Sequence, residues 1–303
     1  MWRLARPLAV LLAAALCVLP ANLHADEPRR IISLAPSVTE TIFALGLGDR
    51  LVGVSIYCDY PPAAATIDRV GTFLTPNIER IVAKHPDLVI AVPSPGNQNP
   101  VQALERLGLR VVVVDPHTLV EIKDSIVTIG RELGHEASAH VLVAEIDRRM
   151  EAVRAQVTDA PERKVLMVVG QTPLIAVGSG MFQDELIRMA RGVNVAAAAG
   201  AWPHLSLEFA IAAAPEVIID TTMGNEERAG ASAAMAFWSA FPTIPAVKDR
   251  RVYGYKAYQL LRPGPRIADA FEAIAHFIHP ERFPTASEHQ TLNFGPWTLD
   301  ECT

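Results

Sequence analysis

The sequence predicts an α/β fold made of two similar lobes, each with a central parallel sheet, joined by a single long α-helix. Three observations predict it: a repeat at a fixed offset, an alternation of buried strands with helices, and one long stretch without proline or glycine. The chain has 303 residues, of which half are hydrophobic and a fifth are charged. That length is enough for two domains of ordinary size with packed cores.

The repeat places matching residues in both halves of the chain. Phe73–Glu79 and Pro86–Ile90 recur as Trp202–Glu208 and Pro215–Ile219, and the differences 202 − 73 and 208 − 79 are equal. Each copy reads as a loop aromatic, an N-cap, an acidic residue in the first helical turn, a short helix stopped by proline, and a buried strand. Such a repeat indicates two lobes of similar build.

The first lobe is predicted to span residues 29–134. Ser37 to Glu40 reads as a capping box, and the helix should continue from Thr41 to Leu45. Strands are predicted at residues 30–34, 51–54, 88–92 and 111–114. Helical segments fall between these strands, which is the pattern of a parallel sheet.

Residues 136–157 form the longest stretch that lacks proline and glycine, and we predict one helix there. An apolar stripe at helical spacing supports it, made of Val141, Ile146, Met150 and Val153. We assign residues 135–160 to this interlobe helix. A helical connection is stiffer than a linker rich in glycine and serine, so we expect little closure around a ligand.

The second lobe is predicted to span residues 163–280 and to end with a helix at 267–278. Its strands are predicted at residues 165–169, 174–177, 217–219 and 252–255. Residues 281–303 form a polar tail that contains proline, and the sequence does not define its role.

The segment 1–25 reads as a signal peptide, with a basic start, a short apolar run and a small residue at Ala25. The run is too short to span a membrane. Leu16 precedes Cys17 where a lipoprotein site needs a small residue, so we expect cleavage near Ala25 and a soluble periplasmic protein. Export permits a disulfide between Cys58 and Cys302, although nothing in the sequence indicates that they meet.

The sequence argues against nucleic-acid binding and against catalysis. The net charge is −6 and there is no basic stripe. Phosphate-loop and nucleophile-elbow motifs are absent. His135 and His140 are five residues apart, which places them roughly 140° apart on a helix. We therefore expect no catalytic residue, no metal and no cofactor. An exported metal-dependent hydrolase, the alternative from another class, would need a converging cluster of His, Asp or Glu.

Several aromatic residues and arginines indicate ligand binding instead. Tyr57 follows the second strand at its carboxyl end, where parallel sheets bind ligands. Phe73 and Trp202 occupy matching loops, so a shared interlobe cleft is favoured over separate packing roles. Arg262 and Arg266 flank a Pro-Gly-Pro turn. One of them could face an anionic ligand while the other caps a carbonyl or pairs on the surface.

Glu79 and Glu208 each lie in the first turn of a predicted helix. An acidic residue there complements the helix dipole, and that explanation is sufficient for either one alone. Their matching positions on two lobes make a paired docking role a competing interpretation.

These residues resemble the solute-binding proteins of ABC importers for cobalamin, haem and iron-siderophores, over residues 30–280. The segments that carry the resemblance are Arg30–Glu40, Val52–Pro61, Asn77–Ile81 and Trp202–Glu208. The Tyr57-Cys-Asp-Tyr-Pro motif is most similar to the cobalamin-binding branch. The resemblance implies a helical-backbone periplasmic binding protein that does no chemistry on its ligand.

The resemblance also implies roles for individual residues. The positions implied to bind the corrinoid are Tyr57, Phe73, Trp202 and Arg262. Glu79 and Glu208 are implied to engage arginines of the membrane permease dimer. Phe73 stands where the cobalamin branch has tryptophan, Val92 and Ile175 replace two aromatic residues, and Tyr258 replaces an acidic residue. We expect a monomer that carries cobalamin or a related corrinoid, with haem or a ferric siderophore as the alternative.

Overall fold

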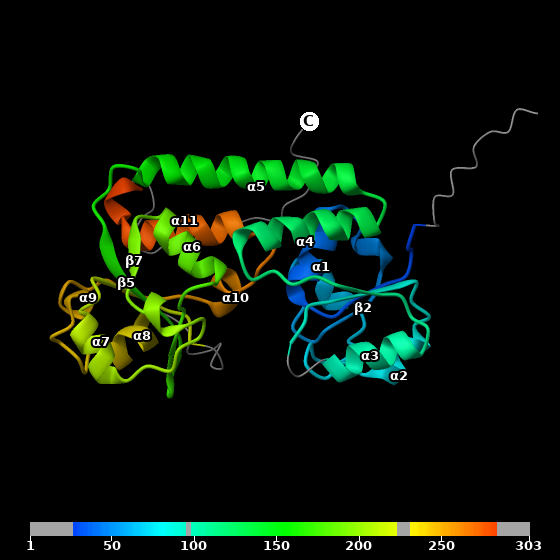
Figure 1. Ribbon diagram of the computed structural model, residues 1–303, viewed down its shortest axis with the longest axis horizontal. Coiled ribbons are helices and arrows are strands. Elements are labelled where there is room, and N and C mark those ends of the chain that lie inside the picture. Colours follow the sequence, from blue (N-terminus) through cyan, green and yellow to red (C-terminus); the bar gives the residue numbers. More distant parts are fainter. Residues whose placement is uncertain (1–26, 95–97, 223–230, 284–303) are drawn as a thin grey trace, which may run out of the picture.

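The computed structural model describes residues 27–94, 98–222 and 231–283. Two α/β lobes lie side by side along one long helix, α5 (Glu136–Val157), which runs across both of them (Figure 1). Each lobe has its own sheet, so the predicted fold class is confirmed. The predicted signal peptide, Cys302 and most of the predicted tail lie outside the described residues.

The first lobe contains a four-stranded parallel sheet with the strand order β2-β1-β3-β4. Ile31 of β1 pairs with Leu51 on one side and with Leu88 on the other. The strands are β1 (Ile31–Ser33), β2 (Leu51–Val54), β3 (Leu88–Ala91) and β4 (Val111–Val113). The helices are α1 (Pro36–Ala44), α2 (Ile78–Ala83), α3 (Gln98–Arg106) and α4 (Leu119–Glu132), with 3-10 helices at Gly48–Arg50 and Pro62–Thr66. Because the strands are parallel, the loops after them gather at one edge of the sheet.

The second lobe contains a five-stranded sheet around the long strand β5 (Arg163–Gln171). Val165 of β5 pairs with Val217 of β8 on one side and with Asn194 of β7 on the other. The remaining strands are β6 (Leu174–Ala176), β7 (Gly192–Asn194), β8 (Val217–Asp220) and β9 (Val252–Gly254). The helices are α6 (Phe182–Met189), α7 (Leu207–Ala213), α8 (Ala231–Trp238), α9 (Pro245–Lys248), α10 (Ala257–Leu260) and α11 (Ile267–Ile278), with 3-10 helices at Ala197–Ala199 and Pro280–Arg282.

One strand of the second sheet departs from the predicted parallel arrangement. β6 pairs with β5 in the antiparallel direction, while β7, β8 and β9 pair in parallel. Only Thr172 and Pro173 separate β5 from β6. A connection of two residues can join antiparallel strands, whereas parallel strands need a long crossover.

The predicted capping box at the start of the first helix is wrong. α1 begins at Pro36 with Ala35 in the N-cap position, and no side chain caps it. Proline suits the first turn because its missing N–H group has no helical partner there. Glu40 therefore lies within the helix, where only 3% of it is exposed.

A continuous hydrophobic core runs through both lobes beneath α5. It includes Ile31 from the first sheet and Val165 from the second. The residues that α5 buries are Ala139, Leu142, Ile146, Met150, Val153 and Val157. Val141, which the sequence analysis placed on the apolar stripe, is exposed instead. Helices α4 and α11 pack against α5, so this helix is part of both lobes and not a free linker.

The lobes also meet away from α5. The backbone N–H of Phe182 at the start of α6 donates to His117 O (2.7 Å), and Leu119 N donates to Glu185 Oε2 (3.2 Å). These bonds join the start of α4 in the first lobe to α6 in the second. The relative position of the lobes is therefore fixed by more than the connecting helix.

Candidate ligand-binding site

The structure brings two of the predicted ligand-binding residues, Tyr57 and Phe73, into contact. Tyr57 lies in the loop after β2, and a hydrogen bond from Ile56 N to Gly71 O (2.9 Å) holds this loop beside the one that carries Phe73. The two rings meet edge to face, with centroids 5.9 Å apart. Tyr57 is 47% exposed and Phe73 is half-buried. The pair therefore presents aromatic surface next to the carboxyl end of the first sheet.

The Tyr57 loop, residues 55–60, is also fixed from within its own lobe. Arg69 Nη1 donates to the carbonyl oxygens of Ser55 (3.2 Å) and Cys58 (2.7 Å). The buried Cys58 Sγ lies 3.1 Å from Thr39 Oγ1 and 3.2 Å from Ser55 Oγ. Burial raises the pKa of this thiol, although its hydroxyl hydrogen bonds act in the opposite direction. Cys58 is thus an uncharged packing residue under the loop at neutral pH.

Trp202, the predicted counterpart of Phe73, lies in the second lobe and is 43% exposed. Backbone hydrogen bonds fasten its segment to the region of β6: Ala176 N donates to Pro203 O (3.1 Å) and Gly178 N donates to Ala201 O (2.8 Å). The ring is consequently carried on a well-anchored backbone at the edge of the second sheet. Tyr57 and Phe73 belong to one lobe and Trp202 to the other.

Arg262 pairs with carboxylates of the first lobe. Its Nη1 donates to Glu40 Oε1 (3.1 Å) and Asp59 Oδ1 (2.5 Å), and its Nη2 donates to Tyr57 O (3.2 Å). Burial alone lowers the pKa of a guanidinium group, but the hydrogen bond to Asp59 and the charge of Glu40 outweigh this and raise the pKa of Arg262. Arg262 is therefore a charged group held at the boundary between the lobes.

Arg266 completes this contact. Its Nε and Nη2 donate to the two oxygens of Glu40 at 2.8 and 2.7 Å, in the bidentate geometry that strengthens such pairs. Its guanidinium carbon lies 3.9 Å from the centroid of the Tyr60 ring. The sequence left open which of the two arginines faces an anionic ligand, and the structure pairs both of them with Glu40. A Cβ atom on Gly264 would lie 3.4 Å from Ser37 Cα, so the segment packs closely against α1.

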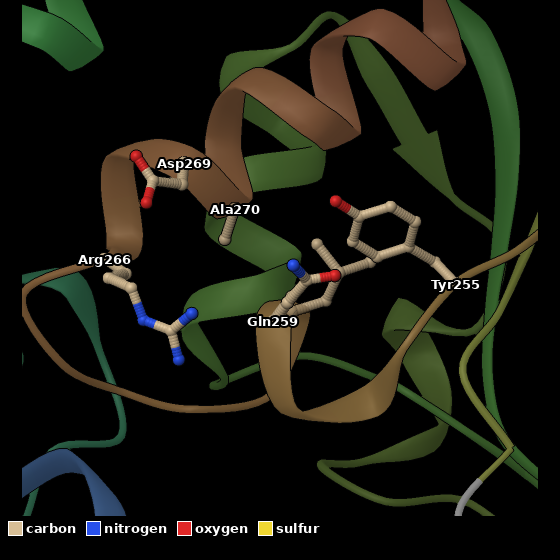
Figure 2. Close-up of a pocket in the computed structure, with 6 residues that line it drawn as sticks. Tyr255, Gln259, Arg266, Asp269 and Ala270 are labelled. Atoms are coloured by element: carbon tan, nitrogen blue, oxygen red, sulfur yellow. The ribbon is translucent and has the colours of Figure 1, made fainter. Parts of the chain in front are cut away.

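A small pocket lies behind this contact, where α10 meets the start of α11. Figure 2 shows Tyr255, Gln259, Arg266, Asp269 and Ala270 around it. Its volume of about 10 Å³ is roughly the room that one water molecule needs. Burial raises the pKa of Tyr255 to about 12 and raises the pKa of the Asp269 carboxyl. A pocket of this size does not hold a large ligand, and we assign none to it.

Glu79 and Glu208 both lie in the first turns of short helices, as predicted. In α2 the Asn77 side chain accepts a hydrogen bond from Arg80 N (2.9 Å), and in α7 Ser206 accepts one from Phe209 N (3.1 Å). Both glutamates are exposed. Hydrogen bonds from its own backbone N–H and from Ser206 lower the pKa of Glu208. Figure 1 shows α2 and α7 in different lobes, both on the side of the molecule opposite α5.

The sequence does not indicate that Glu40 and Asp59 belong to this region. Its local patterns place Glu40 in a helix cap and Asp59 in the motif that contains Tyr57. Their partner Arg262 lies 222 and 203 positions further along the chain, respectively. One local signal was available for Glu40, because an acidic residue on the buried face of a helix requires a charged partner.

The described residues lack two further features. Within residues 27–94, 98–222 and 231–283, no three His, Cys, Asp or Glu side chains are grouped in a way that would hold a metal ion. None of the helices in the same ranges combines the length and apolar character needed to cross a membrane. The converging cluster that the hydrolase alternative requires is therefore not formed by these residues.

Comparison with known proteins gives a family match over most of the chain. The model of the periplasmic binding protein family matches residues 31–259. A vitamin B12-binding protein of Vibrio cholerae serotype O1 is 32% identical over 251 residues, covering 82% of this chain and 88% of that protein. A vitamin B12-binding protein of Vibrio vulnificus is 29% identical over 274 residues, covering 89% of this chain and 98% of that protein.

Solved structures show the same architecture. The periplasmic vitamin B12-binding protein BtuF of Vibrio cholerae superposes with a TM-score of 0.73 at 30% identity, covering 84% of this chain and 98% of that one. The periplasmic haem-binding protein RhuT from Roseiflexus sp. RS-1 superposes with a TM-score of 0.75 at 26% identity, covering 84% and 99%. The two neighbours are described by different ligands, although their similarity to this fold is nearly equal.

Proposed function

The chain belongs to the periplasmic binding protein family, and from this premise we propose that it binds cobalamin or a related corrinoid between its lobes and delivers it to the permease of an ABC importer. The observation that carries the proposal is the contact between the exposed Tyr57 ring and the half-buried Phe73 ring on the loops beside β2. Aromatic rings offer large contact areas to flat ligands. The motif that contains Tyr57 is also the one most similar to the cobalamin-binding branch.

The proposed site uses residues from both lobes. Tyr57 and Phe73 would contact the corrinoid from the first lobe, and Trp202 from the second. Arg262 joins the second lobe to this group, because its guanidinium binds the carbonyl of Tyr57. The identity of the ligand is supported by relatives that are named for vitamin B12 and match this chain over at least four-fifths of its length.

A ligand titration tests this proposal. Purified protein is titrated with cyanocobalamin, haem and a panel of ferric siderophores, and binding is followed by visible absorbance and calorimetry. We expect saturable one-to-one binding of cyanocobalamin. Binding of haem or a siderophore together with no response to cyanocobalamin would replace the corrinoid by that alternative ligand.

We further propose that Glu79 and Glu208 bind arginines on the two halves of the permease. The support is their exposure at matching helix starts, one on each lobe, on the side opposite α5 (Figure 1). Carboxylates placed in this way would orient the complex and speed its formation.

The proposed location is the periplasm, after removal of a signal peptide near Ala25. The short apolar run and the small residue before Asp26 support this cleavage position. N-terminal sequencing of the exported protein should begin near Asp26. A lipid-modified Cys17 in the mature protein would contradict the proposal and place the protein on a membrane surface.

A further inference from the structure

The contact between the lobes at Arg262 and Arg266 is balanced in charge. Two arginines of the second lobe meet two carboxylates of the first, Glu40 and Asp59, within 2.5 to 3.1 Å. Glu40 is 3% exposed, and the side chains of Arg262 and Arg266 are 15% and 12% exposed. Asp59 is the only one of the four whose side chain is largely in solvent, at 55%. The cluster therefore has three largely buried members and one accessible member, Asp59.

The same cluster holds the loop that carries Tyr57. Arg262 donates to Tyr57 O from the second lobe, while Arg69 donates to Ser55 O and Cys58 O from the first. Three carbonyl oxygens of one short loop are thus bound by arginines of both lobes. Arg266 also lies over the ring of Tyr60 at the end of this loop. The position of the exposed Tyr57 ring consequently depends on contacts made by both lobes.

We propose that Glu40, Asp59, Arg262 and Arg266 form an interlobe clamp that positions the Tyr57 ring and directs the site toward ligands without carboxylates. This inference rests on the proposed function and sharpens it. A corrinoid carries carboxamides around most of its edge, whereas haem carries two carboxylates. The clamp accepts the first kind of ligand more readily than the second.

The physical reason is that the positive charge of Arg262 is already matched. Three N–H groups of Arg262 are engaged with the first lobe, of the five that a guanidinium has. A ligand carboxylate that approached Arg262 would lie near Asp59 and near the buried Glu40, whose negative charges already offset that of the guanidinium. These like charges disfavour a ligand that carries carboxylates. Carboxamides bring no net charge and meet no such penalty.

The decisive variant is Asp59→Asn, which removes one negative charge but keeps an oxygen that accepts a hydrogen bond from Arg262. The ratio of haem affinity to cyanocobalamin affinity should rise by about tenfold, as expected for one unmatched charge near a protein surface. Asp49→Asn is the matched control, because Asp49 is an exposed carboxylate of the same lobe outside the cluster. The control should leave both affinities unchanged.

A second variant tests positioning. Arg262→Gln should speed amide hydrogen exchange in residues 55–60 and weaken cyanocobalamin binding, whereas Asp59→Asn should leave this exchange close to the wild-type rate. Circular dichroism confirms that each variant is folded.

The proposal is overturned if Asp59→Asn leaves the affinity ratio at its wild-type value, or if Asp49→Asn raises it equally. Unchanged exchange in Arg262→Gln would remove the positioning role. Failure of the wild-type protein to bind any corrinoid would instead overturn the proposed function. In that case, comparing the haem affinities of Asp59→Asn and the wild-type protein would still test whether the clamp disfavours carboxylates.

Discussion

The start of α2 in the first lobe and the start of α7 in the second repeat the same local structure. Both helices are capped by a short polar side chain, at Asn77 and Ser206. Ile81 and Ala210 are completely buried at matching positions, and Val82 and Ile211 are exposed to 37% and 39%. The repeat therefore preserves the orientation of each helix, and with it the outward direction of each glutamate.

The loops in front of these helices are different. Phe73 packs edge to face on Tyr57, a residue of another loop in its own lobe. The segment of Trp202 is bound to the backbone of the β6 region, and its ring remains exposed. The two lobes therefore share the surface proposed for the permease but not the surroundings of the aromatic ring proposed for the ligand.

The largest expected effect comes from removing both members of the shared feature. Glu79→Ala combined with Glu208→Ala should abolish most ligand uptake by cells while leaving ligand affinity unchanged. The reason is that both carboxylates are exposed in the first turns of their helices and are not among the residues proposed to contact the ligand. The free energy lost when these carboxylates no longer interact with the helix dipoles is too small to unfold a protein of ordinary stability.

Uptake and ligand titration should be measured side by side for this double variant. The matched control is Glu105→Ala with Glu151→Ala, which removes two exposed carboxylates on α3 and α5 and should leave uptake intact. Wild-type uptake by the Glu79/Glu208 variant would leave the dipole interaction as the sole role of these residues. Unequal losses of uptake in Glu79→Ala and Glu208→Ala as single variants would show that the two lobes contribute differently to docking.

An effect of intermediate size, on corrinoid affinity, should distinguish the roles of the Phe73 loop and the Trp202 loop. Trp202→Ala should weaken corrinoid binding by roughly thirtyfold, because truncating an aromatic anchor often costs ~2 kcal/mol. Phe73→Ala should weaken it as well, through loss of its own contact and of the support it gives to Tyr57. The Phe73 variant should also change the fluorescence of Tyr57 in the absence of ligand, because the two rings are in contact. The Trp202 variant should not, because Trp202 belongs to the other lobe.

Calorimetric titration with cyanocobalamin measures both affinities. Unchanged affinity in Trp202→Ala would make this residue a packing residue of its loop. An unaltered environment of Tyr57 in Phe73→Ala would show that the ring contact in the first lobe does not position the tyrosine.

Much of the fold followed from local patterns in the sequence. The bounds of α5 and α11 agree with the predicted helices at 136–157 and 267–278. Proline, glycine and the apolar periodicity act within a few residues, so they define such segments well. Ile146, Met150 and Val153 of the predicted apolar stripe of α5 are buried, but its first member is wrong, because Leu142 is buried in place of Val141. One residue corresponds to roughly 100° of rotation, and packing against α4 and α11 decides between them.

The parts that could not be predicted depend on distant partners. β7 has only three residues, too few to show alternation, and it forms because β5 offers it a free edge. Glu40 binds Arg262 and Arg266, which follow it by 222 and 226 positions in the chain. No local pattern contains that information. The sequence therefore indicated the aromatic residues of the candidate site, which lie in recognisable loops. It did not indicate the carboxylates that bind Arg262.

The smallest expected effect, a change in stability, comes from the N-cap residues of α2 and α7. Asn77→Ala and Ser206→Ala should each lower the free energy of unfolding by about 1 kcal/mol, since each removes one hydrogen bond to a free N–H group of the first turn. Replacement by glycine should cost only a few tenths of that amount. Because one hydrophobic core runs through both lobes, both variants should shift a single urea transition, and the double variant should show the sum of the two losses. Two separate transitions, one shifted by Asn77→Ala and the other by Ser206→Ala, would show that the lobes unfold independently and that α5 does not couple them.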